Sequence, residues 1–564
     1  MMRCRPGIVA NTMFAAVADQ SRTALHCAAS ATQTALQPSP SVTSRLLRRA
    51  LRARECGELE TAERLYNAVL AQRPENFEAL HGLGHIHLQC GRLDTALVLF
   101  QEAVKADLAR HDGFASLGLA FHALKLWDRA LVAYDAGLRL APADAELLNR
   151  RGVALLELGR IREALENFEC ILAAHPRRVD ALGNCGNALF RLNRPAEAIE
   201  IYDRALALEP ASAQLWTNRA IALRRLDRPH AALISAARAT ATEPDFEPAR
   251  FVESSIRLYL GDFAAGWAGY EWRQGGARAS RRRKLGAPLW LGKESLAGKI
   301  ILLHAEQGFG DTLQFVRYAP MLAARGARVV LEVQPQLLRL LSGMPGIDTV
   351  LAQRQKLPPF DFHCPLLSLP LAFGTELDSI PAKVPYIAAS ADRVAYWRQR
   401  LPRGRALVGL AWAGERAHDN DVNRSIALKL LTPLLDAANV QFVSLQHDVR
   451  EDDAPLLGER GDVLQIGREF GDFADTAAAI AALDAVISVD TAVAHLAGAM
   501  GKPLFLLLPF AADFRWLRQR RDSPWYPSAR LYRQRQFGDW GSAVAQVADE
   551  LARCLLQDRC GWTA

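Results

Sequence analysis

The sequence contains no apolar run long enough to cross a lipid bilayer. A spanning helix needs about 20 consecutive apolar residues, whereas the longest apolar stretch, residues 503–510, has the length of a buried strand. Half of the 564 residues are apolar and 23% are charged, which is ordinary for a soluble globular protein. We therefore expect no membrane span. The length exceeds one hydrophobic core, so we expect two or more domains.

Closely paired cysteines are also missing. The nine cysteines are scattered from Cys4 to Cys560, and none form a C-x-x-C pair. This pattern argues against a disulfide framework and against a zinc site. We therefore expect a reducing, cytoplasmic location and no bound metal.

The N-terminal 40 residues lack the apolar core and small-residue cleavage site of a secretory signal. We interpret residues 1–42 as a poorly ordered leader, with a transit peptide as the alternative. The net charge of +7 is spread along the chain, and the basic run 281–284 has no aromatic or groove-reading elements beside it. We interpret this run as a solvated linker rather than a polyanion site, and expect no nucleic-acid partner.

A step of 34 residues organises the first half of the chain. Prolines, glycines, alanines and aromatic residues each return at this step or at twice its length. The four phases are Pro74, Pro142, Pro176, Pro210 and Pro244; Gly84, Gly118, Gly152 and Gly186; Ala62, Ala96, Ala130, Ala164, Ala198 and Ala232; and Tyr66, Phe100, Tyr134, Phe168 and Tyr202. Coincidence does not keep four phases aligned over so many periods, so the step indicates a repeat architecture.

Each repeat is predicted to be a pair of antiparallel helices. The glycine and alanine would lie where the helices cross closely, and the aromatic would fill the gap toward the next unit. The proline would end the second helix and turn the chain into the next repeat. The pattern resembles the tetratricopeptide repeat over residues 43–275. That resemblance implies an α solenoid whose groove binds an extended peptide or a partner helix.

The repeat signal weakens at its end. Ala220 replaces the glycine and Ala236 replaces the aromatic, but the phase returns in residues 261–272. This segment contains three aromatics that look exposed from the sequence alone, namely Trp267, Tyr270 and Trp272. We interpret it as a final, atypical repeat that docks onto the next domain. The alternative is a simple capping helix.

Short apolar runs alternate with helical stretches after residue 285. Strands are expected at 300–303, 328–333, 406–410, 441–445, 485–489 and 504–508. Such alternation predicts parallel sheets covered on both faces. We expect one α/β domain at 276–390 and a second at 391–564, with a ligand site at the carboxyl ends of the strands, in a cleft between the two sheets.

The turn after the first of these strands is rich in glycine. Gly308 and Gly310 would let the backbone turn tightly and approach a ligand. Asp311 follows at the expected start of a helix over 312–324. Its side chain could cap that helix, which the spacing alone favours, or could take a proton from an acceptor hydroxyl in the cleft. The register of a dinucleotide site, G-x-G-x-x-G, is absent.

A second strand-to-helix junction follows the strand at 485–489. Free backbone N–H groups at a helix start near Thr491 could hold a diphosphate, and the small Ala492 would let a ligand come close. His495 lies one turn further on. A lone histidine at such a place is usually structural, but here it shares a strand end with Asp490, which favours a site.

These two junctions resemble the heptosyltransferase-type family of glycosyltransferases. The resemblance rests on Gly310-Asp311 and on the run Asp-Thr-Ala-Val-Ala-His-Leu-Ala at 490–497. Supporting segments lie at 288–290, 307–318, 412–414, 423–426 and 522–527, and the whole match spans 255–545. The chain is more similar still to bacterial proteins that join tetratricopeptide repeats to such a domain. The family implies a GT-B fold, which is two facing Rossmann-like domains, and metal-independent, inverting transfer from a nucleotide sugar without a cofactor.

The resemblance also implies roles for individual residues. Asp311 would be the general base, and Arg424 would be a cation on the diphosphate, which gains charge as it leaves. The full implied donor site comprises Gly308, Gly310, Gln314, Trp412, Arg424, Asp490, Thr491, Ala492, Val493 and His495. The family's usual glycine after Asp-Thr is Ala492 in this sequence. Residues 418–420 could line the cleft or form a solvated loop.

We therefore expect a glycosyltransferase whose repeats recruit the acceptor, an arrangement analogous to the protein O-GlcNAc transferases. The acceptor would be a protein, and a small molecule or a lipid-linked glycan is the alternative. The competing function is a non-catalytic protein-protein interaction scaffold with a degenerate transferase-like domain.

Overall fold

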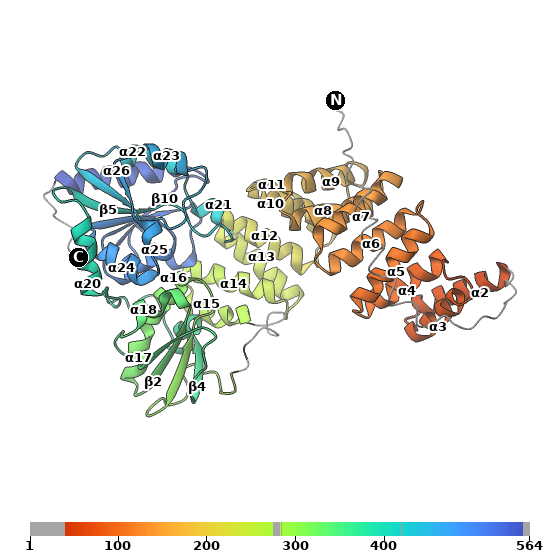
Figure 1. Ribbon diagram of the computed structural model, residues 1–564, viewed down its shortest axis with the longest axis horizontal. Helices are drawn as coiled ribbons and strands as arrows, with labels where there is room; N and C mark the ends of the chain where they lie inside the picture. The colour runs from red at the N-terminus through yellow and green to blue at the C-terminus, as the bar shows by residue number, and fades with distance from the viewer. Residues whose placement is uncertain (1–39, 275–282, 284, 419, 557–564) are drawn as a thin grey trace. The chain divides into compact units, whose positions relative to one another are not determined.

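The computed structural model describes residues 40–274, 283, 285–418 and 420–556 (Figure 1). Three features predicted from the sequence lie wholly or largely outside the described residues: the expected leader except for its end, most of the basic run at 281–284, and Asp419 of the polar loop. The chain divides into two compact units, residues 1–160 and 161–564. The repeat helices from α9 onward therefore belong to the same unit as the α/β region.

The first unit consists of paired helices (Figure 1). They are α2 (Pro40–Glu55), α3 (Leu59–Leu70), α4 (Phe77–Gln89), α5 (Leu93–Ala106), α6 (His111–Ala123), α7 (Trp127–Leu140) and α8 (Ala145–Glu157). Asn76 and Asp144 begin two of them, since each side chain accepts a hydrogen bond from the backbone N–H three residues on. Pro74 and Pro142 follow the ends of α3 and α7, as the periodicity predicts.

Two of the periodic glycines of this unit are needed because an aromatic ring covers them. A Cβ on Gly84 would lie 2.6 Å from the ring of Phe100, and one on Gly118 would lie 2.3 Å from Tyr134. Each ring thus packs on the glycine of its own helix pair. Both rings also belong to a core cluster that includes residues of the next pair, in agreement with the prediction that the aromatics fill the gap toward the next unit. Helices of one pair cross so closely that the ring takes the place of the missing side chain.

The second unit begins with more repeat helices. They are α9 (Ile161–Ala174), α10 (Val179–Arg191), α11 (Pro195–Leu208), α12 (Ala213–Arg225), α13 (Pro229–Thr242), α14 (Glu247–Leu260), α15 (Phe263–Tyr270) and the short η1 (Glu271–Gln274). Gly186 repeats the pattern, because a Cβ there would lie 2.4 Å from Tyr202.

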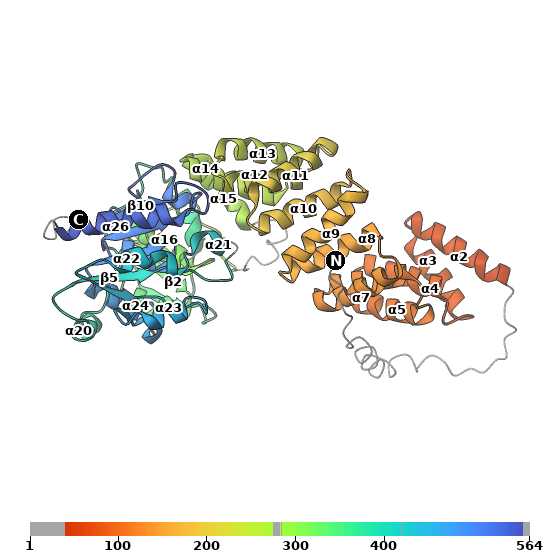
Figure 2. The same ribbon diagram turned by 90° about the horizontal axis from the view of Figure 1, so that it is seen from above.

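The last repeat packs directly against the α/β region (Figure 2). Trp267 is 2% exposed, and its ring meets Phe315 and Phe514 at centroid distances of 6.1 and 5.7 Å. Tyr270 meets Phe514 at 5.6 Å. The sequence-based view of a final repeat that docks is therefore confirmed. Trp267 and Tyr270 would be exposed on the repeats alone, and the α/β region covers them.

Two parallel sheets follow. The first has the order β3-β2-β1-β4, with β1 (Ile300–His304), β2 (Arg328–Val333), β3 (Thr349–Ala352) and β4 (Phe362–Pro365). The second has the order β10-β9-β8-β5-β6-β7, with β5 (Ala406–Ala411), β6 (Val440–Ser444), β7 (Val463–Gln465), β8 (Ala485–Val489), β9 (Leu504–Leu508) and β10 (Ala529–Arg533). All six predicted strands are present. β3, β4, β7 and β10 were missed because they are short or lie at sheet edges with exposed positions.

Helices cover both faces of the second sheet (Figure 1). Every residue of β8 and β9 is buried, which explains their continuous apolar sequences. One face packs on α20 (Ala391–Arg400), α24 (Phe473–Ala482) and α25 (Ala492–Ala499). The other packs on α22 (Thr432–Leu435), α23 (Ala454–Glu459) and α26 (Trp540–Leu556).

The helix expected at 312–324 is broken into three pieces. They are α16 (Phe309–Phe315), η3 (Val316–Tyr318) and α17 (Ala319–Ala324). α16 therefore starts earlier than predicted. The remaining short elements are η4 (Pro335–Leu337), α18 (Leu338–Leu341), η5 (Leu366–Ser368), α19 (Leu369–Ala372), α21 (Asp421–Arg424), η6 (Leu428–Leu431), η7 (Gly467–Glu469) and η8 (Phe514–Trp516).

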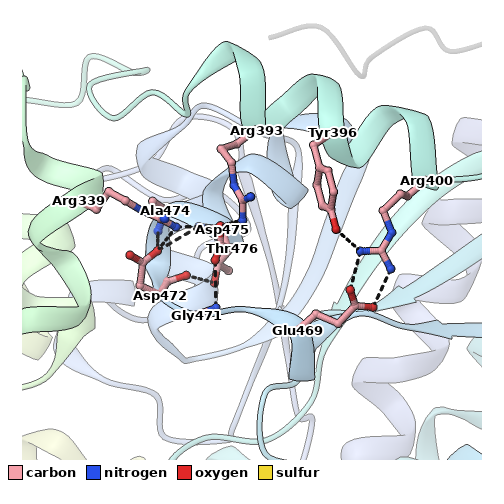
Figure 3. A network of polar contacts seen from close by, with 10 residues as sticks. All are labelled: Arg339, Arg393, Tyr396, Arg400, Glu469, Gly471, Asp472, Ala474, Asp475 and Thr476. Atoms are coloured by element: carbon pink, nitrogen blue, oxygen red, sulfur yellow. Dashed lines mark hydrogen bonds and ion pairs between the residues drawn. The ribbon is translucent and has the colours of Figure 1, made fainter.

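A polar network joins the segments around the two sheets (Figure 3). Asp475 on α24 accepts hydrogen bonds from Arg339 on α18 (2.8 Å) and from Arg393 on α20. Asp472 caps α24 and also pairs with Arg339 at 2.8 Å. Because Arg339 lies between β2 and β3 of the first sheet and both aspartates lie between β7 and β8 of the second, the network links the two α/β halves. No helix in the described part of the chain is long and apolar enough to cross a membrane.

Candidate functional site

Each sheet has one place where its strand order reverses. In the first sheet, β2 and β3 lie on one side of β1 and β4 lies on the other. In the second, β6 and β7 lie beyond β5, whereas β9 and β10 lie beyond β8. Ligands of parallel sheets bind at such switch points, outside the carboxyl ends of the strands. Asp311 follows β1 and Asp490 follows β8, so each of these carboxylates lies at a switch point.

Asp311 lies in the first turn of α16. Gly308 precedes the helix, and its N–H donates to the Asp311 carboxylate at 3.0 Å. The expectation that Asp311 is the N-cap residue is therefore corrected. The N-cap is Gly308, and Asp311 lies three residues later, where its carboxylate accepts a hydrogen bond from the backbone of the N-cap. The other carboxylate oxygen is ion-paired with Arg515. Burial raises the pKa of Asp311 above its ordinary value, Arg515 opposes that shift and Asp513 adds to it.

Arg515 lies in the loop after β9 and is a member of the site that sequence reasoning missed. Its guanidinium bridges Asp311 from the first sheet and Asp513 (2.8 Å) from its own loop. Its Nε is buried without a hydrogen-bond partner. The predicted strand at 504–508 could have pointed to this loop. Because β9 pairs with β8 in parallel, the loop after β9 begins at the same sheet edge as Asp490.

Asp490 and Arg424 meet at the switch point of the second sheet. Arg424 donates from Nη1 to the backbone oxygen of Asp490 at 3.2 Å, and its Nε is buried without a partner. Burial, with a contribution from Asp513, raises the pKa of the Asp490 carboxyl from 3.8 to about 6. Arg424 thus has spare hydrogen-bonding capacity beside a carboxyl group that accepts a proton unusually readily.

Helix α25 starts at this junction, as predicted. Thr491 is its N-cap in an extended conformation, and its side chain does not cap the helix. The first-turn N–H groups therefore lack a side-chain acceptor, the arrangement that suits an anion. Thr491, Ala492 and Val493 are only partly buried. Of the predicted donor residues, Arg424, Asp490, Thr491, Ala492 and Val493 are thus brought to one sheet edge.

His495 is enclosed rather than open to a ligand. Its Nδ1 hydrogen-bonds the Tyr526 hydroxyl at 2.9 Å, and its ring stacks on Trp516 with centroids 5.3 Å apart. Nε2 lies 3.7 Å from Asp490. Burial, helped by Arg515, lowers the pKa of His495 to about 3. The imidazole is therefore neutral at physiological pH and supplies no positive charge to a diphosphate.

The two turn glycines differ from what the sequence suggested. Gly308 has φ −69°, which any residue adopts, so a tight turn does not require glycine there. A Cβ on Gly310 would lie 2.7 Å from the ring of His495. Gly310 is thus needed because α16 and α25 approach closely, and the space expected for a ligand is occupied by the histidine.

Two further predicted donor residues are not placed at the site. Trp412 is 1% exposed, and its Nε1 donates to Asp453 at 2.8 Å within the core of the second sheet. Gln314 is completely buried, and neither amide atom has a hydrogen-bond partner. A ligand cannot reach either side chain in this arrangement. Among the described residues, no group of three or more His, Cys, Asp or Glu could hold a metal ion.

Comparison with known proteins supports the repeats. Residues 53–114 match one tetratricopeptide-repeat family model, and residues 149–213 and 185–248 match another. The chain is 28% identical over 336 residues to Protein FlbA of Caulobacter vibrioides, covering 54% of this chain and 55% of FlbA. It therefore spans about half the length of that curated relative.

Solved structures similar to this chain include a tetratricopeptide repeat protein from Parabacteroides merdae. The identity is 18%, the TM-score is 0.37, and the match covers 44% of this chain and 95% of the other. The PilF protein of Pseudomonas aeruginosa is 20% identical with a TM-score of 0.32, covering 36% of this chain and 95% of the other.

Proposed function

We propose that the α/β region is a GT-B glycosyltransferase that transfers a sugar from a nucleotide-sugar donor. The observation that carries the proposal is the pairing of two features at the strand ends. One is Asp311, a carboxylate of raised pKa after β1. The other is the anion-binding arrangement of Arg424 and the uncapped start of α25 after β8. Together they provide a base and a cradle for a leaving diphosphate.

The chemistry assigns a separate step to each group. The donor diphosphate would accept hydrogen bonds from the first turn of α25 and from Arg424. The Asp311 carboxylate would take the proton of the acceptor hydroxyl as that oxygen bonds to the anomeric carbon. The bond from that carbon to the diphosphate would break with its electron pair, inverting the configuration. Arg424 would stabilise the charge that develops on the leaving group. No metal ion or cofactor takes part in the proposed reaction.

Arg515 would have two sets of partners. In the structure it pairs with Asp311 and Asp513. Its unpaired Nε and its position after β9 would let it turn toward a bound diphosphate, which would leave Asp311 a stronger base. The neutral His495 would hold the spacing between α16 and α25 instead of contacting the phosphates.

The proposal is tested with Asp311→Asn. We expect this variant to fold and to bind nucleoside diphosphate as the wild type does, because asparagine has the same shape. Transfer from a panel of nucleotide sugars should fall by about 10²–10⁴-fold, the usual contribution of a general base. Glu451→Gln, an exposed charge change in the same region, is the matched control. Unchanged transfer by Asp311→Asn would remove Asp311 from the mechanism.

The repeats would recruit the acceptor, which we propose to be a protein located in the cytoplasm. Stacked tetratricopeptide repeats present an extended groove suited to peptides and helices, and all three matched segments lie in the first 250 residues. Mass spectrometry of cellular proteins with and without the gene tests this. A sugar mass shift on a protein retained by the repeats would support a protein acceptor, whereas a shift on small molecules or lipid-linked glycans would contradict it.

A second candidate is a non-catalytic scaffold. It is favoured by the engagement of Asp311 with both Arg515 and the Gly308 N–H, because these two partners occupy both oxygens of the carboxylate. Calorimetry against nucleoside diphosphates and nucleotide sugars separates the two functions. Binding without turnover of any donor would support the scaffold, and turnover would exclude it.

A further inference from the structure

The loop between β9 and β10 is held by the repeat helices as well as by its own sheet. This loop, residues 509–528, carries both Asp513 and Arg515. Arg224 at the end of α12 donates from Nη2 to the backbone oxygen of Ala512 at 2.7 Å. Trp267 and Tyr270 of α15 pack on Phe514. The segment that delivers Arg515 to Asp311 is therefore bounded on one side by the solenoid.

Asp227 adds an ion pair to these attachments. It lies in the turn between α12 and α13, with φ 50°, a left-handed conformation that aspartate and asparagine tolerate better than most residues. Arg518 binds its carboxylate through two hydrogen bonds of 3.0 and 2.9 Å. The Tyr259 hydroxyl of α14 donates to the same carboxylate at 2.7 Å. Such a two-point arginine–carboxylate pair fixes orientation as well as distance.

The loop needs this support because its backbone is strained next to the site. Leu517 has φ 52° and ψ −163°, a combination that only glycine adopts without cost. Gln519, on the far side of Arg518, also has a positive φ of 51°. Arg518 thus lies between two residues in unfavourable conformations, and its pair with Asp227 holds them in place. Strained residues persist only where their surroundings over-determine them.

A second attachment holds the turn on the other side of the site. Arg273 of η1 is buried, and it pairs with Glu306 at 2.9 Å, in the turn between β1 and α16. Arg273 also pairs with Glu271 at 2.7 Å and donates to Ser368 at 2.7 Å. Both segments that meet at the Asp311–Arg515 pair are therefore tied to the last repeats.

We propose that the last repeats of the solenoid are part of the catalytic machinery, with Asp227 as a positioning residue that holds Arg515 against Asp311 through Arg518. This rests on the proposed function for its catalytic consequence, but the positioning itself does not. Asp227 touches no reacting atom. A ligand that shifts the turn between α12 and α13 would be sensed at the site through this connection.

The test uses the full chain and the variant Asp227→Asn, which keeps the left-handed turn and the shape of the side chain but removes the charge. Asp203→Asn is the matched control, since Asp203 pairs with Arg219 within the same repeats at 2.6 Å and touches no part of the loop. Hydrogen–deuterium exchange of peptides from residues 509–528 is measured first. We expect Asp227→Asn to speed exchange of this loop by about tenfold, the effect of losing one charge-assisted pair, and Asp203→Asn to leave it unchanged.

The pair is confirmed by a double-mutant cycle with Arg518→Gln. Each single variant should loosen the loop, and the double variant should loosen it no further than either one. Additive effects, or a loop whose exchange is unchanged in Asp227→Asn, would overturn the positioning role whether or not the protein is a transferase.

The catalytic consequence is measured with any UDP-, GDP- or CMP-linked sugar that the wild-type chain turns over. Releasing Arg515 raises the pKa of Asp311, because Arg515 lowers it in the wild type. The acid limb of the pH profile of kcat/KM, which reports the free enzyme, should therefore move to higher pH in Asp227→Asn, but not in Asp203→Asn. A uniform loss of rate at every pH would overturn the proposal by showing a merely structural role. If the wild type turns over none of these sugars, the proposed function fails and the exchange data still decide the positioning.

Discussion

Replacing Gly310 by alanine tests whether α16 and α25 are packed as closely as the structure shows. The new Cβ would lie 2.7 Å from Cδ2 and 3.3 Å from Nε2 of His495, whereas carbon atoms pack best at about 3.5–4.0 Å. The ring cannot retreat, because Trp516 stacks on one face and the Tyr526 hydroxyl holds Nδ1 at 2.9 Å. The added methyl group must therefore push the two helices apart.

The expected cost follows from two opposing effects. Overpacking a tight contact costs about 1–3 kcal/mol, and the better helix propensity of alanine returns up to about 1 kcal/mol. We expect Gly310→Ala to lower the free energy of unfolding of the α/β region by about 1–2 kcal/mol. Because the displacement separates Asp311 from the second sheet, sugar transfer should slow as well.

The assay is urea unfolding followed by tryptophan fluorescence. Five tryptophans are fully or almost fully buried in the α/β region, so the signal reports on that region: Trp290, Trp397, Trp412, Trp516 and Trp525. Gly308→Ala is the control, because its φ is −69° and the nearest atom to a new Cβ is 3.5 Å away. If Gly310→Ala proves as stable as Gly308→Ala, the close approach of α16 and α25 is refuted.

Three further predictions concern single side chains. Trp412→Phe should lose about 1 kcal/mol of stability with its hydrogen bond to Asp453, and should leave nucleotide affinity measured by calorimetry unchanged; weaker binding would return Trp412 to the donor site. In the wild type, Asp490 ionises as pH rises through about 6, and its negative charge then repels the diphosphate. Asp490→Asn should therefore make diphosphate binding less dependent on pH. An equal pH dependence in both proteins would contradict this. Burial favours protonation of Asp475, but its arginine partners and the Gly471 N–H lower its pKa below 3.8. The stabilising contribution of Asp475 is therefore present above about pH 4 and lost below it. Asp475→Asn should remove this loss of stability at acid pH, measured by urea unfolding. If the stability of the variant falls with pH as that of the wild type does, Asp475 does not contribute.

The repeats and the main strands could be predicted because their signals are local and recur. The 34-residue phases place small residues wherever an aromatic must fit, as for Gly84 under Phe100. β8 and β9 are buried throughout and read as continuous apolar runs. Edge strands such as β3 and β7 are short and partly exposed, so their sequences carry little pattern.

Two carboxylates of the candidate site could be predicted from the strands before them. Asp490 follows β8 directly, and Asp311 lies in the first turn of the helix after β1. Arg424 was predicted only from the family resemblance. Arg515 was missed because its partner Asp311 lies 204 residues earlier in the chain, and no local pattern connects them. Trp412 was misassigned because a tryptophan after a strand suits a ligand or a core equally well, and its partner Asp453 lies 41 residues on. Gly310 was correctly predicted to lie at a close approach, but the neighbour is His495 and not a ligand. The sequence does not show this, because His495 becomes adjacent to Gly310 only in the folded chain.

The central claim is a donor diphosphate site at the start of α25, and calorimetric titration with UDP and GDP tests it most directly. Arg424 is the matched probe, because its unpaired Nε lies at the strand end beside Asp490. Lys429→Gln removes an exposed positive charge from the same segment and serves as the control. The account predicts that the wild type and Lys429→Gln bind one of these nucleotides with the same affinity. Arg424→Gln should bind it at least about tenfold more weakly, because it loses one charge-assisted hydrogen bond. Equal binding by all three proteins, or binding by none, would contradict it.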